Sequence, residues 1–262
     1  MKQFSVFGNP IEHSISPKLH NAAFKALRID ANYSKTLLEN GGKLREKFLE
    51  LRLCGANITV PHKEAAFAMC DDVVGIAREI EAVNTIVQKN ARLIGFNTDA
   101  GGFLRAIKEF GEIKNALILG AGGTAKAIAF MLKENGVSVD ILNRSKERLS
   151  FFQEKGFLAF SHEDFRVKKY DIVINTTSAG LKDDALPAPR ELINEILKNA
   201  KFGFDVIYGR QTPFLHLCEE NTLTYKDGLD MLLYQAVLAF NLFFDNAYDE
   251  GEIAKAMKFV TS

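Results

Sequence analysis

A short apolar run that leads into a cluster of glycines lies near the middle of this 262-residue chain. Residues 116–119 read Ala-Leu-Ile-Leu, and a helical pattern begins after the glycines and stops at Gly136. This order of strand, tight turn and helix is typical of a βαβ unit that binds a dinucleotide, although a tight turn alone can look similar. The free N–H groups of the helix end would attract the phosphates. The expected pyrophosphate loop comprises Gly120, Ala121, Gly122, Gly123 and Thr124, and Ala125 would allow close packing of the helix.

The residues after the next expected strand indicate which dinucleotide binds. An NAD site usually carries Asp or Glu about 20 residues after the glycines, bonded to the ribose 2′-hydroxyl. This chain has Asn143, Arg144 and Ser145 there, with Arg148 one helical turn later. A guanidinium can bind a 2′-phosphate with two charge-assisted hydrogen bonds, whereas a carboxylate would repel it. The expected cofactor is therefore NADP(H). The alternative is that Ser145 caps a helix and that the arginines are solvated surface charges.

Composition argues against several other classes of protein. The chain balances 33 basic against 33 acidic residues, and no basic block suggests a nucleic-acid partner. Its three cysteines form no metal-spaced pair, and no histidine pairing suggests a ligand set, so no metal site is expected. We see neither a signal peptide nor a segment suited to spanning a bilayer, and we expect a cytoplasmic location and no membrane partner. Monomer and homodimer stay equally open.

Strand-like and helix-like runs alternate along the chain, which favours an α/β fold with parallel sheets. We expect two lobes, with residues 1–101 and 229–262 forming a substrate-binding catalytic domain and residues 102–228 forming a Rossmann-type NADP-binding domain. The C-terminal helices should pack back on the first lobe, and the ligands should bind in a cleft between the lobes. Strands are expected at 4–8, 56–60, 82–88, 92–96, 116–119, 137–142, 171–176 and 202–208, and helices at 17–27, 43–53 and 126–135. The strands at 82–88 and 92–96 are expected to form a hairpin-like pair around residues 89–91.

Small polar side chains collect at the ends of the apolar runs in the first hundred residues. Ligands of parallel α/β sheets bind beyond the carboxyl ends of the strands, where several of these side chains would lie. Serine hydroxyls could hold a carboxylate, amides and hydroxyls could bond sugar-like hydroxyls, and Lys63 with Asp99 would form a proton-transfer pair. The candidates are Ser14, Ser16, Thr59, Lys63, Asn84, Thr85, Asn97, Thr98 and Asp99.

Each candidate also has a plain structural explanation. Ser14 and Ser16 could only shape a turn and cap the helix that follows. Lys63 could be a surface lysine, and Asp99 could cap the helix expected near residue 102. Gln235 lies in an apolar helix, where its partner could be a substrate or a backbone carbonyl. The threonines and asparagines could fill strands or satisfy turn backbone.

Taken together, these motifs resemble the shikimate dehydrogenase family, from Phe7 to about Phe240. In the first lobe the resemblance rests on Gly8-Asn9-Pro10, His13-Ser14-x-Ser16-Pro17, Asn57-x-Thr59-Val60-Pro61-x-Lys63, Ala82-Val83-Asn84-Thr85 and Asn97-Thr98-Asp99. In the second it rests on the glycine loop, Asn143-Arg144-Ser145, Asn175-Thr176-Thr177-Ser178-Ala179-Gly180, Asp205-Val206-Ile207-Tyr208, Thr212-Pro213-Phe214 and Asp227-Gly228-Leu229, followed by Gln235-Ala236. Many motifs in retained order are far more specific than a lone glycine pattern.

The resemblance implies reduction of 3-dehydroshikimate to shikimate with NADPH, in the biosynthesis of chorismate and the aromatic amino acids. It implies that Lys63 and Asp99 are the catalytic pair and that Ser14 and Ser16 bind the substrate carboxylate. The remaining substrate contacts would be Thr59, Lys63, Asn84, Asp99, Tyr208 and Gln235. The cofactor would meet the pyrophosphate loop, then Asn143, Arg144, Ser145 and Arg148 at the 2′-phosphate, and Thr176, Thr177, Ser178, Val206 and Gly228 at the ribose and nicotinamide.

Three alternative functions stay open at this point. A quinate/shikimate dehydrogenase with relaxed cofactor choice would carry the same motifs. A methylenetetrahydrofolate-type dehydrogenase has a similar two-lobed build but leaves the two-serine motif unexplained. A non-catalytic module that senses NADP(H) would lack Lys63 and Asp99 in its cleft, although the sequence retains both residues.

Overall fold

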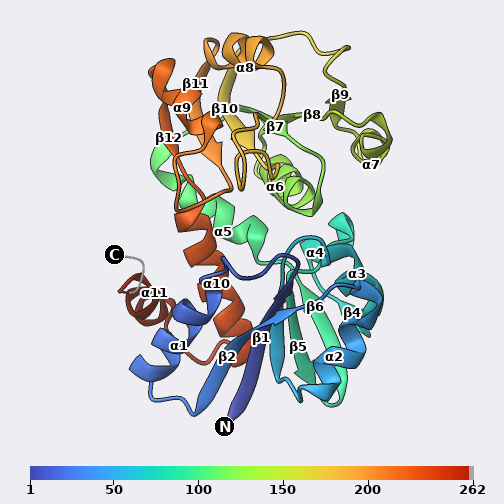
Figure 1. Ribbon diagram of the computed structural model, residues 1–262, viewed down its shortest axis with the longest axis vertical. Helices are drawn as coiled ribbons and strands as arrows, with labels where there is room; N and C mark the ends of the chain where they lie inside the picture. Colours follow the sequence, from blue (N-terminus) through green and yellow to red (C-terminus); the bar gives the residue numbers. More distant parts are fainter. Residues whose placement is uncertain (260–262) are drawn as a thin grey trace. The chain divides into compact units, whose positions relative to one another are not determined.

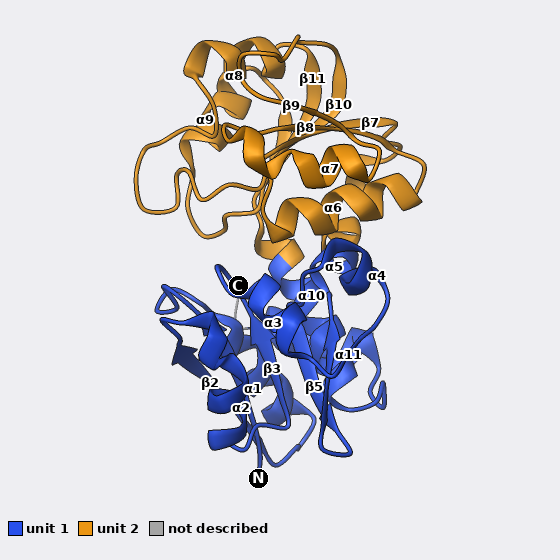
Figure 2. Ribbon diagram, turned by 90° about the vertical axis from the view of Figure 1, so that its right-hand side faces the viewer, with its two compact units in different colours: residues 1–102, 232–262 blue, residues 103–231 orange. Residues whose placement is uncertain are grey.

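The computed structural model describes residues 1–259, and the chain divides into two compact units (Figure 2). Unit 1 comprises Met1–Gly102 and Leu232–Ser262, and unit 2 comprises Phe103–Met231. Two helices, α5 (Asp99–Ala106) and α10 (Leu229–Phe243), contribute residues to both units. The predicted roles, substrate binding and catalysis for residues 1–101 and 229–262 and NADP binding for residues 102–228, stay predictions.

Unit 1 is built on a six-stranded sheet in the order β2-β1-β3-β5-β6-β4 (Figure 1). Its β5 runs antiparallel to both neighbours, β3 and β6, whereas the other strand pairs of this unit are parallel. The expected hairpin accounts for the pairing of β5 with β6: Asn90 and Ala91 have φ of 49° and 62°, and such a two-residue turn sends the chain straight back. The strands are β1 (Lys2–Gly8), β2 (Ala31–Leu37), β3 (Gly55–Ile58), β4 (Asp72–Val73), β5 (Thr85–Lys89) and β6 (Arg92–Phe96).

Helices cover both faces of this sheet. Successive side chains of a strand point to opposite faces, and β1 sends Phe4 and Val6 into one apolar cluster and Phe7 into another. The first cluster includes residues of α1 (Ser16–Ala26), α10 and α11 (Glu250–Lys258), so the C-terminal helices pack on the first lobe as predicted. The second includes residues of α2 (Leu44–Glu50), α3 (Lys63–Met69) and α4 (Ile76–Ile80), and the 3-10 turn η1 (Gly41–Lys43) precedes α2.

Unit 2 carries a fully parallel six-stranded sheet in the order β12-β11-β10-β7-β8-β9. Counted in chain order within the unit, this is the Rossmann arrangement, in which the strand order reverses between β7 and β10. The predicted Rossmann-type fold is therefore confirmed. The strands are β7 (Asn115–Leu119), β8 (Ser138–Leu142), β9 (Leu158–Phe160), β10 (Tyr170–Asn175), β11 (Ala200–Asp205) and β12 (Thr224–Lys226).

The helices of unit 2 also lie on its sheet. Residues of α8 (Arg190–Leu197) and α9 (Pro213–Glu220) share a cluster with β7, β8 and β10, and Phe103 of α5 packs edge-on against Phe204, with ring centroids 5.1 Å apart. Strand β11 ends at Asp205, three residues before the predicted 208, because the Asp205 carboxylate accepts the Ile207 N–H at 3.0 Å and turns the chain. The remaining elements are α6 (Gly123–Glu134), α7 (Ser150–Glu154), η2 (Lys108–Phe110) and η3 (Lys146–Arg148).

One histidine lies at the centre of the unit 1 core. His20 is fully buried, and its ring stacks on Tyr33 with centroids 4.3 Å apart. Neither ring nitrogen has a hydrogen-bond partner among residues 1–259. Burial lowers the pKa of His20 to about 3, so the folded protein holds it neutral where the unfolded chain would be protonated.

We expect His20→Phe to make the protein less sensitive to acid. Below pH 6.5 the unfolded His20 takes up a proton that the folded form does not bind until about pH 3, so stability is lost as the pH falls through this window. Between pH 7 and pH 4.5 this linkage costs about 3 kcal/mol. Urea unfolding of wild type and variant at both pH values measures it. Equal losses of unfolding free energy in the two proteins would contradict the assignment.

Candidate functional site

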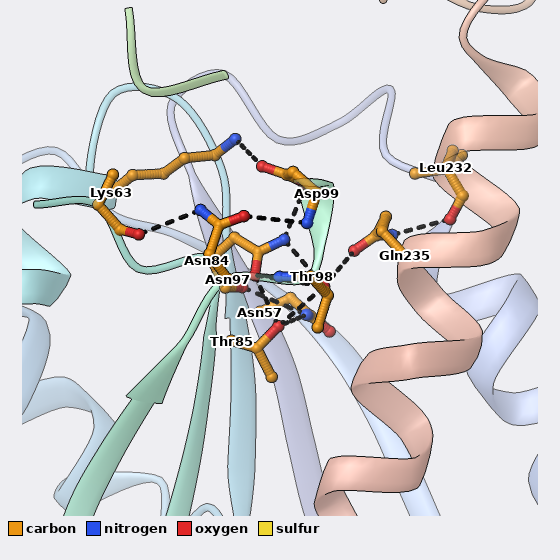
Figure 3. Close-up of polar contacts among 10 residues, drawn as sticks. Asn57, Lys63, Asn84, Thr85, Asn97, Thr98, Asp99, Leu232 and Gln235 are labelled. Carbon is orange, nitrogen blue, oxygen red and sulfur yellow. Dashed lines mark hydrogen bonds and ion pairs between the residues drawn. The ribbon is translucent and has the colours of Figure 1, made fainter. Parts of the chain in front are cut away.

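Lys63 and Asp99 meet in unit 1, although they lie 36 positions apart in the chain (Figure 3). Lys63 begins α3, just after β3 ends, and Asp99 begins α5. The Lys63 Nζ lies 2.5 Å from the Asp99 Oδ2, and the two side chains are only 12% and 11% exposed. The explanation of Lys63 as a surface lysine is therefore wrong. Partial burial strengthens the attraction between the charges and leaves a small opening to a ligand.

The amide of Asn84 orients this pair. Its Nδ2 donates to the Asp99 Oδ1 at 2.8 Å and to the Thr98 Oγ1 at 3.0 Å, and its Oδ1 accepts the Thr98 N–H at 2.8 Å. Both oxygens of Asp99 thus have partners. At the start of α5, the Asn97 Oδ1 accepts a hydrogen bond from the Asp99 backbone N–H at 3.0 Å. Because Asn84 is 2% exposed, its hydrogen bonds compete little with water and fix the carboxylate firmly.

A second layer of polar groups lies beneath Asn84. The Asn57 Nδ2 donates to the Asn84 carbonyl at 3.2 Å and to the Thr85 Oγ1 at 3.0 Å, and the Tyr33 hydroxyl donates to the Asn57 Oδ1 at 2.7 Å. Burial raises the pKa of Tyr33, which keeps its hydroxyl a donor. Sequence reasoning missed Tyr33, because an aromatic residue in a strand is usually only a core residue.

The other predicted substrate residues of unit 1 fall into two groups. Gln235 joins the network, since its Oε1 accepts from the Thr98 hydroxyl at 3.5 Å, and its Nε2 donates to the Leu232 carbonyl at 2.9 Å. Ser14 and Ser16 form a separate buried pair with their hydroxyl oxygens 3.2 Å apart. Ser16 is the first residue of α1, whose cap position is Ile15, so the explanation of Ser16 as a cap is wrong.

Thr59 follows directly after β3 and is half-buried. A Cβ on Gly8 would lie 2.4 Å from the Thr59 Cγ2, so only glycine at position 8 lets the ends of β1 and β3 approach this closely. Tyr208, the remaining predicted substrate residue, is half-buried and belongs to unit 2, three residues after β11.

The predicted pyrophosphate loop lies at the point where the strand order of unit 2 reverses. Gly120 has φ of 110°, and a Cβ there would lie 2.7 Å from the Thr176 Oγ1, so both the turn and the packing require glycine. Gly122 precedes α6, and no described atom lies within 4 Å of where its Cβ would be. Open space in front of the first N–H groups of a 12-residue helix fits the phosphates of a dinucleotide.

The predicted 2′-phosphate residues follow β8. Arg144 and Arg148 are exposed, and the Asn143 Nδ2 donates to the Ser145 carbonyl at 2.9 Å. Ser145 precedes η3, but its side chain makes no capping bond in the described structure, so the capping explanation is wrong. Burial and the Arg144 guanidinium lower the pKa of His162, which follows β9. Sequence reasoning missed His162, because only the pairing of β8 with β9 brings it near Arg144.

The segments predicted to line the ribose and nicotinamide follow β10 and β11. The Thr176 hydroxyl donates to the Leu119 carbonyl at 2.8 Å, and the Thr177 N–H and hydroxyl donate to the Asn175 Oδ1. Ser178 is exposed beside them. Val206 and Gly228 touch: a Cβ on Gly228 would lie 2.2 Å from the Val206 carbonyl oxygen, which only glycine avoids.

A parallel Rossmann sheet with an open glycine turn, accompanied by a buried Lys–Asp pair on a second α/β unit, defines a dinucleotide-dependent oxidoreductase of two domains. Family models agree with each unit. Residues 6–86 match "Shikimate dehydrogenase substrate binding domain", and residues 105–184 match "Shikimate / quinate 5-dehydrogenase". The chain belongs to the shikimate dehydrogenase family.

Individual relatives support this membership. The chain is 48% identical to a shikimate dehydrogenase (NADP(+)) of Helicobacter hepaticus over 95% of this chain and 94% of that protein. It is 47% identical to the Helicobacter pylori enzyme of the same name over 93% and 92%. The crystal structure of a Thermus thermophilus shikimate 5-dehydrogenase with NADP(H) and shikimate matches with a TM-score of 0.84 and 35% identity, over 99% of both chains.

Two features are absent from the described residues. None of the helices within residues 1–259 is long and apolar enough to cross a membrane. In the same part of the chain, no cluster of three or more His, Cys, Asp or Glu side chains is arranged to hold a metal ion.

Two glycine substitutions separate ligand binding from folding. We expect Gly122→Ala to fold with a stability loss of at most about 1 kcal/mol, because its Cβ points into open space, yet to bind NADPH at least about tenfold more weakly. Gly120→Ala should instead lose about 1–3 kcal/mol of stability from its positive φ and its clash with Thr176. Thermal unfolding and calorimetric titration measure both effects. Normal NADPH affinity in Gly122→Ala would argue against a phosphate at this turn.

Proposed function

We propose that this chain catalyses the reversible NADPH-dependent reduction of 3-dehydroshikimate to shikimate. This reaction is a step in the biosynthesis of chorismate and the aromatic amino acids. The observation that carries the proposal is the buried Lys63–Asp99 pair in a chain that matches shikimate dehydrogenases along almost its whole length. We place the reaction in the cytoplasm. The three cysteines are all free thiols, which suits a reducing compartment.

We assign substrate binding in unit 1 to the groups around the pair. The paired hydroxyls of Ser14 and Ser16 suit a carboxylate, because a carboxylate accepts hydrogen bonds from both. Thr59, Asn84, Gln235 and, from unit 2, Tyr208 are assigned to the ring and its hydroxyls. The Asn84 Nδ2 already donates to Asp99 and Thr98, so a bond from it to the substrate would share or replace one of these contacts.

The Lys63–Asp99 pair supplies the proton chemistry. When bound, NADPH supplies the hydride that reduces the carbonyl carbon. Negative charge then grows on the carbonyl oxygen, and the Lys63 ammonium stabilises that oxygen while a proton from the pair converts it to a hydroxyl. Asp99 holds the Lys63 Nζ through Oδ2 and is itself held by Asn84 through Oδ1. Because a coupled pair titrates as a unit, we assign the proton transfer to the pair as a whole.

We assign cofactor binding to unit 2. Gly120, Ala121, Gly122, Gly123 and Thr124 would hold the pyrophosphate at the start of α6. Asn143, Arg144, Ser145 and Arg148 would hold the 2′-phosphate. Thr176, Thr177, Ser178, Val206 and Gly228 would line the ribose and nicotinamide. The exposure of both arginines leaves their guanidinium groups accessible to a phosphate.

Oxidation of quinate is the second candidate activity, because the family model that matches residues 105–184 names both substrates. Initial rates of shikimate and quinate oxidation, each with NADP⁺ and with NAD⁺, decide between the two. We expect the highest kcat/KM for shikimate with NADP⁺. A higher value for quinate would replace the proposed substrate, and no reduction of either cofactor would refute an oxidoreductase.

In the same assay, we expect Lys63→Ala to lower kcat by about 10²–10⁴-fold, the range that general acid–base catalysis contributes. The variant should still fold and bind NADPH, because Lys63 lies in unit 1 and the residues assigned to the cofactor lie in unit 2. Lys89→Ala is the matched control, because Lys89 also pairs with an aspartate of unit 1, Asp245, but on the exposed surface. Near-normal kcat in Lys63→Ala, or an equal loss in Lys89→Ala, would refute the catalytic role.

We expect Arg144→Ala to weaken NADPH binding by about 10- to 100-fold, the value of a charged hydrogen-bonded contact, and to change NADH binding little. The reason is that NADH lacks the 2′-phosphate. Arg190→Ala, which removes an exposed arginine of unit 2 that pairs with Glu220, is the control and should leave both affinities unchanged. Comparable weakening of both cofactors in Arg144→Ala would count against a 2′-phosphate contact.

A further inference from the structure

A buried carboxylate joins three segments at the carboxyl ends of β10 and β11. The Asp205 Oδ1 accepts the Ile207 N–H at 3.0 Å, and its Oδ2 accepts from the Asn175 Nδ2 at 3.1 Å and the Thr212 hydroxyl at 2.7 Å. The side chain has no exposed surface, and no cation among the described residues pairs with it. All three partners are neutral donors, so the site suits an ionised carboxylate that accepts on both oxygens.

The partners of Asp205 hold neighbouring segments in turn. The Asn175 Oδ1 accepts from the N–H and hydroxyl of Thr177, and the Asn175 carbonyl accepts the Val206 N–H at 3.0 Å. The Ile207 carbonyl accepts the Gly228 N–H at 3.0 Å. The same carboxylate therefore ties together Thr177, Val206 and Gly228, three of the five residues assigned above to the ribose and nicotinamide.

We propose that Asp205 is a positioning residue for the nicotinamide end of the cofactor, acting through Asn175 and Ile207 on the segments that line it. This inference rests on the proposed function, because it deepens the role of the same cofactor site. In the sequence, Asp205 stands out only as the first residue of the Asp205-Val206-Ile207-Tyr208 motif.

Burying the ionised carboxylate of Asp205 costs free energy, which favours a role beyond closing a turn. Burial, together with the nearby Asp227 carboxylate, raises its pKa to about 6, although its three hydrogen bonds lower it. The thiol of Cys218 is the other titratable group that interacts with it, and burial raises the pKa of that thiol to about 12, so it stays neutral. A neutral amide at position 205 would avoid the cost but would present an NH₂ group to donors.

The two ends of the cofactor provide the discriminating test. NADPH reaches both the glycine loop and the nicotinamide segments, whereas 2′,5′-ADP carries only the adenosine end with its phosphates. In Asp205→Asn we expect the Kd of NADPH to rise at least about tenfold and the Kd of 2′,5′-ADP to stay within about twofold, both by calorimetry. General damage to unit 2 would weaken both ligands alike. Equal weakening, or an unchanged NADPH affinity, would overturn the proposal.

A double variant tests the hydrogen bond itself. Asn175→Asp combined with Asp205→Asn exchanges donor and acceptor across the 3.1 Å contact, and Thr177 can still donate to position 175. We expect this exchange to restore NADPH affinity to within about threefold of wild type. An affinity as poor as that of Asp205→Asn would show that the contact does not transmit the effect and would overturn the mechanism.

Two further variants keep the test decisive if Asp205→Asn does not fold. Thr212→Val removes one donor to Asp205 and should weaken NADPH, but not 2′,5′-ADP, by a smaller factor. Asp140→Asn is the control: Asp140 is a buried aspartate of unit 2 in mid-strand, bonded by Tyr170 and Lys168 at 2.7 Å each. It should change thermal stability and leave the ratio of the two Kd values unchanged. An altered ratio in Asp140→Asn would contradict the special role of Asp205.

The same measurements separate this inference from the proposed function. Wild-type protein that binds neither NADPH nor 2′,5′-ADP would refute the NADP site, and with it the role of Asp205. Wild-type protein that binds both, with an unchanged ratio in Asp205→Asn and in Thr212→Val, would leave the proposed function standing and refute Asp205 alone.

Discussion

A buried polar group that lacks a hydrogen-bond partner costs about 1–3 kcal/mol. Both units place many buried polar groups at the ends of their strands, and these groups need partners. Each unit meets this cost with an Asn–Asp contact. In unit 1 the Asn84 amide donates to Asp99 at 2.8 Å, and in unit 2 the Asn175 amide donates to Asp205 at 3.1 Å. In both contacts the amide oxygen of the asparagine accepts a backbone N–H, that of Thr98 for Asn84 and that of Thr177 for Asn175. One side chain thus fixes both a carboxylate and a segment of backbone.

The two contacts differ in what completes the carboxylate. Asp99 receives the ammonium of Lys63, and the pair keeps about a tenth of its side-chain surface exposed. Asp205 receives only neutral donors and has no exposed surface. A charged pair with access to a ligand can exchange a proton with it, whereas a sealed carboxylate can act only on the geometry of its neighbours. The same local device thus serves chemistry in one unit and position in the other.

The parts of this molecule that sequence reasoning reached are those set by local rules. The helix after Gly122, the hairpin at residues 89–91 and the strand before Gly120 follow from periodicity and turn chemistry. The antiparallel pairing of β5 with β3 was not predicted, because it joins segments that are distant in the chain and no short sequence pattern encodes it. Tyr33 and His162 were missed for the same reason: each gains its polar neighbour only through strand pairing or packing.

Hydrogen bonds run across the carboxyl edge of the unit 2 sheet from strand to strand. The Gly120 N–H donates to the Leu142 carbonyl at 2.8 Å, which joins the ends of β7 and β8, and the Thr176 hydroxyl joins β10 to β7. Asn175 then joins β10 to β11 through Asp205. The loop expected to hold the pyrophosphate and the segments expected to line the nicotinamide are therefore parts of one bonded edge. A side chain at position 120 would act on both, because its Cβ would meet the same Thr176 hydroxyl that joins them.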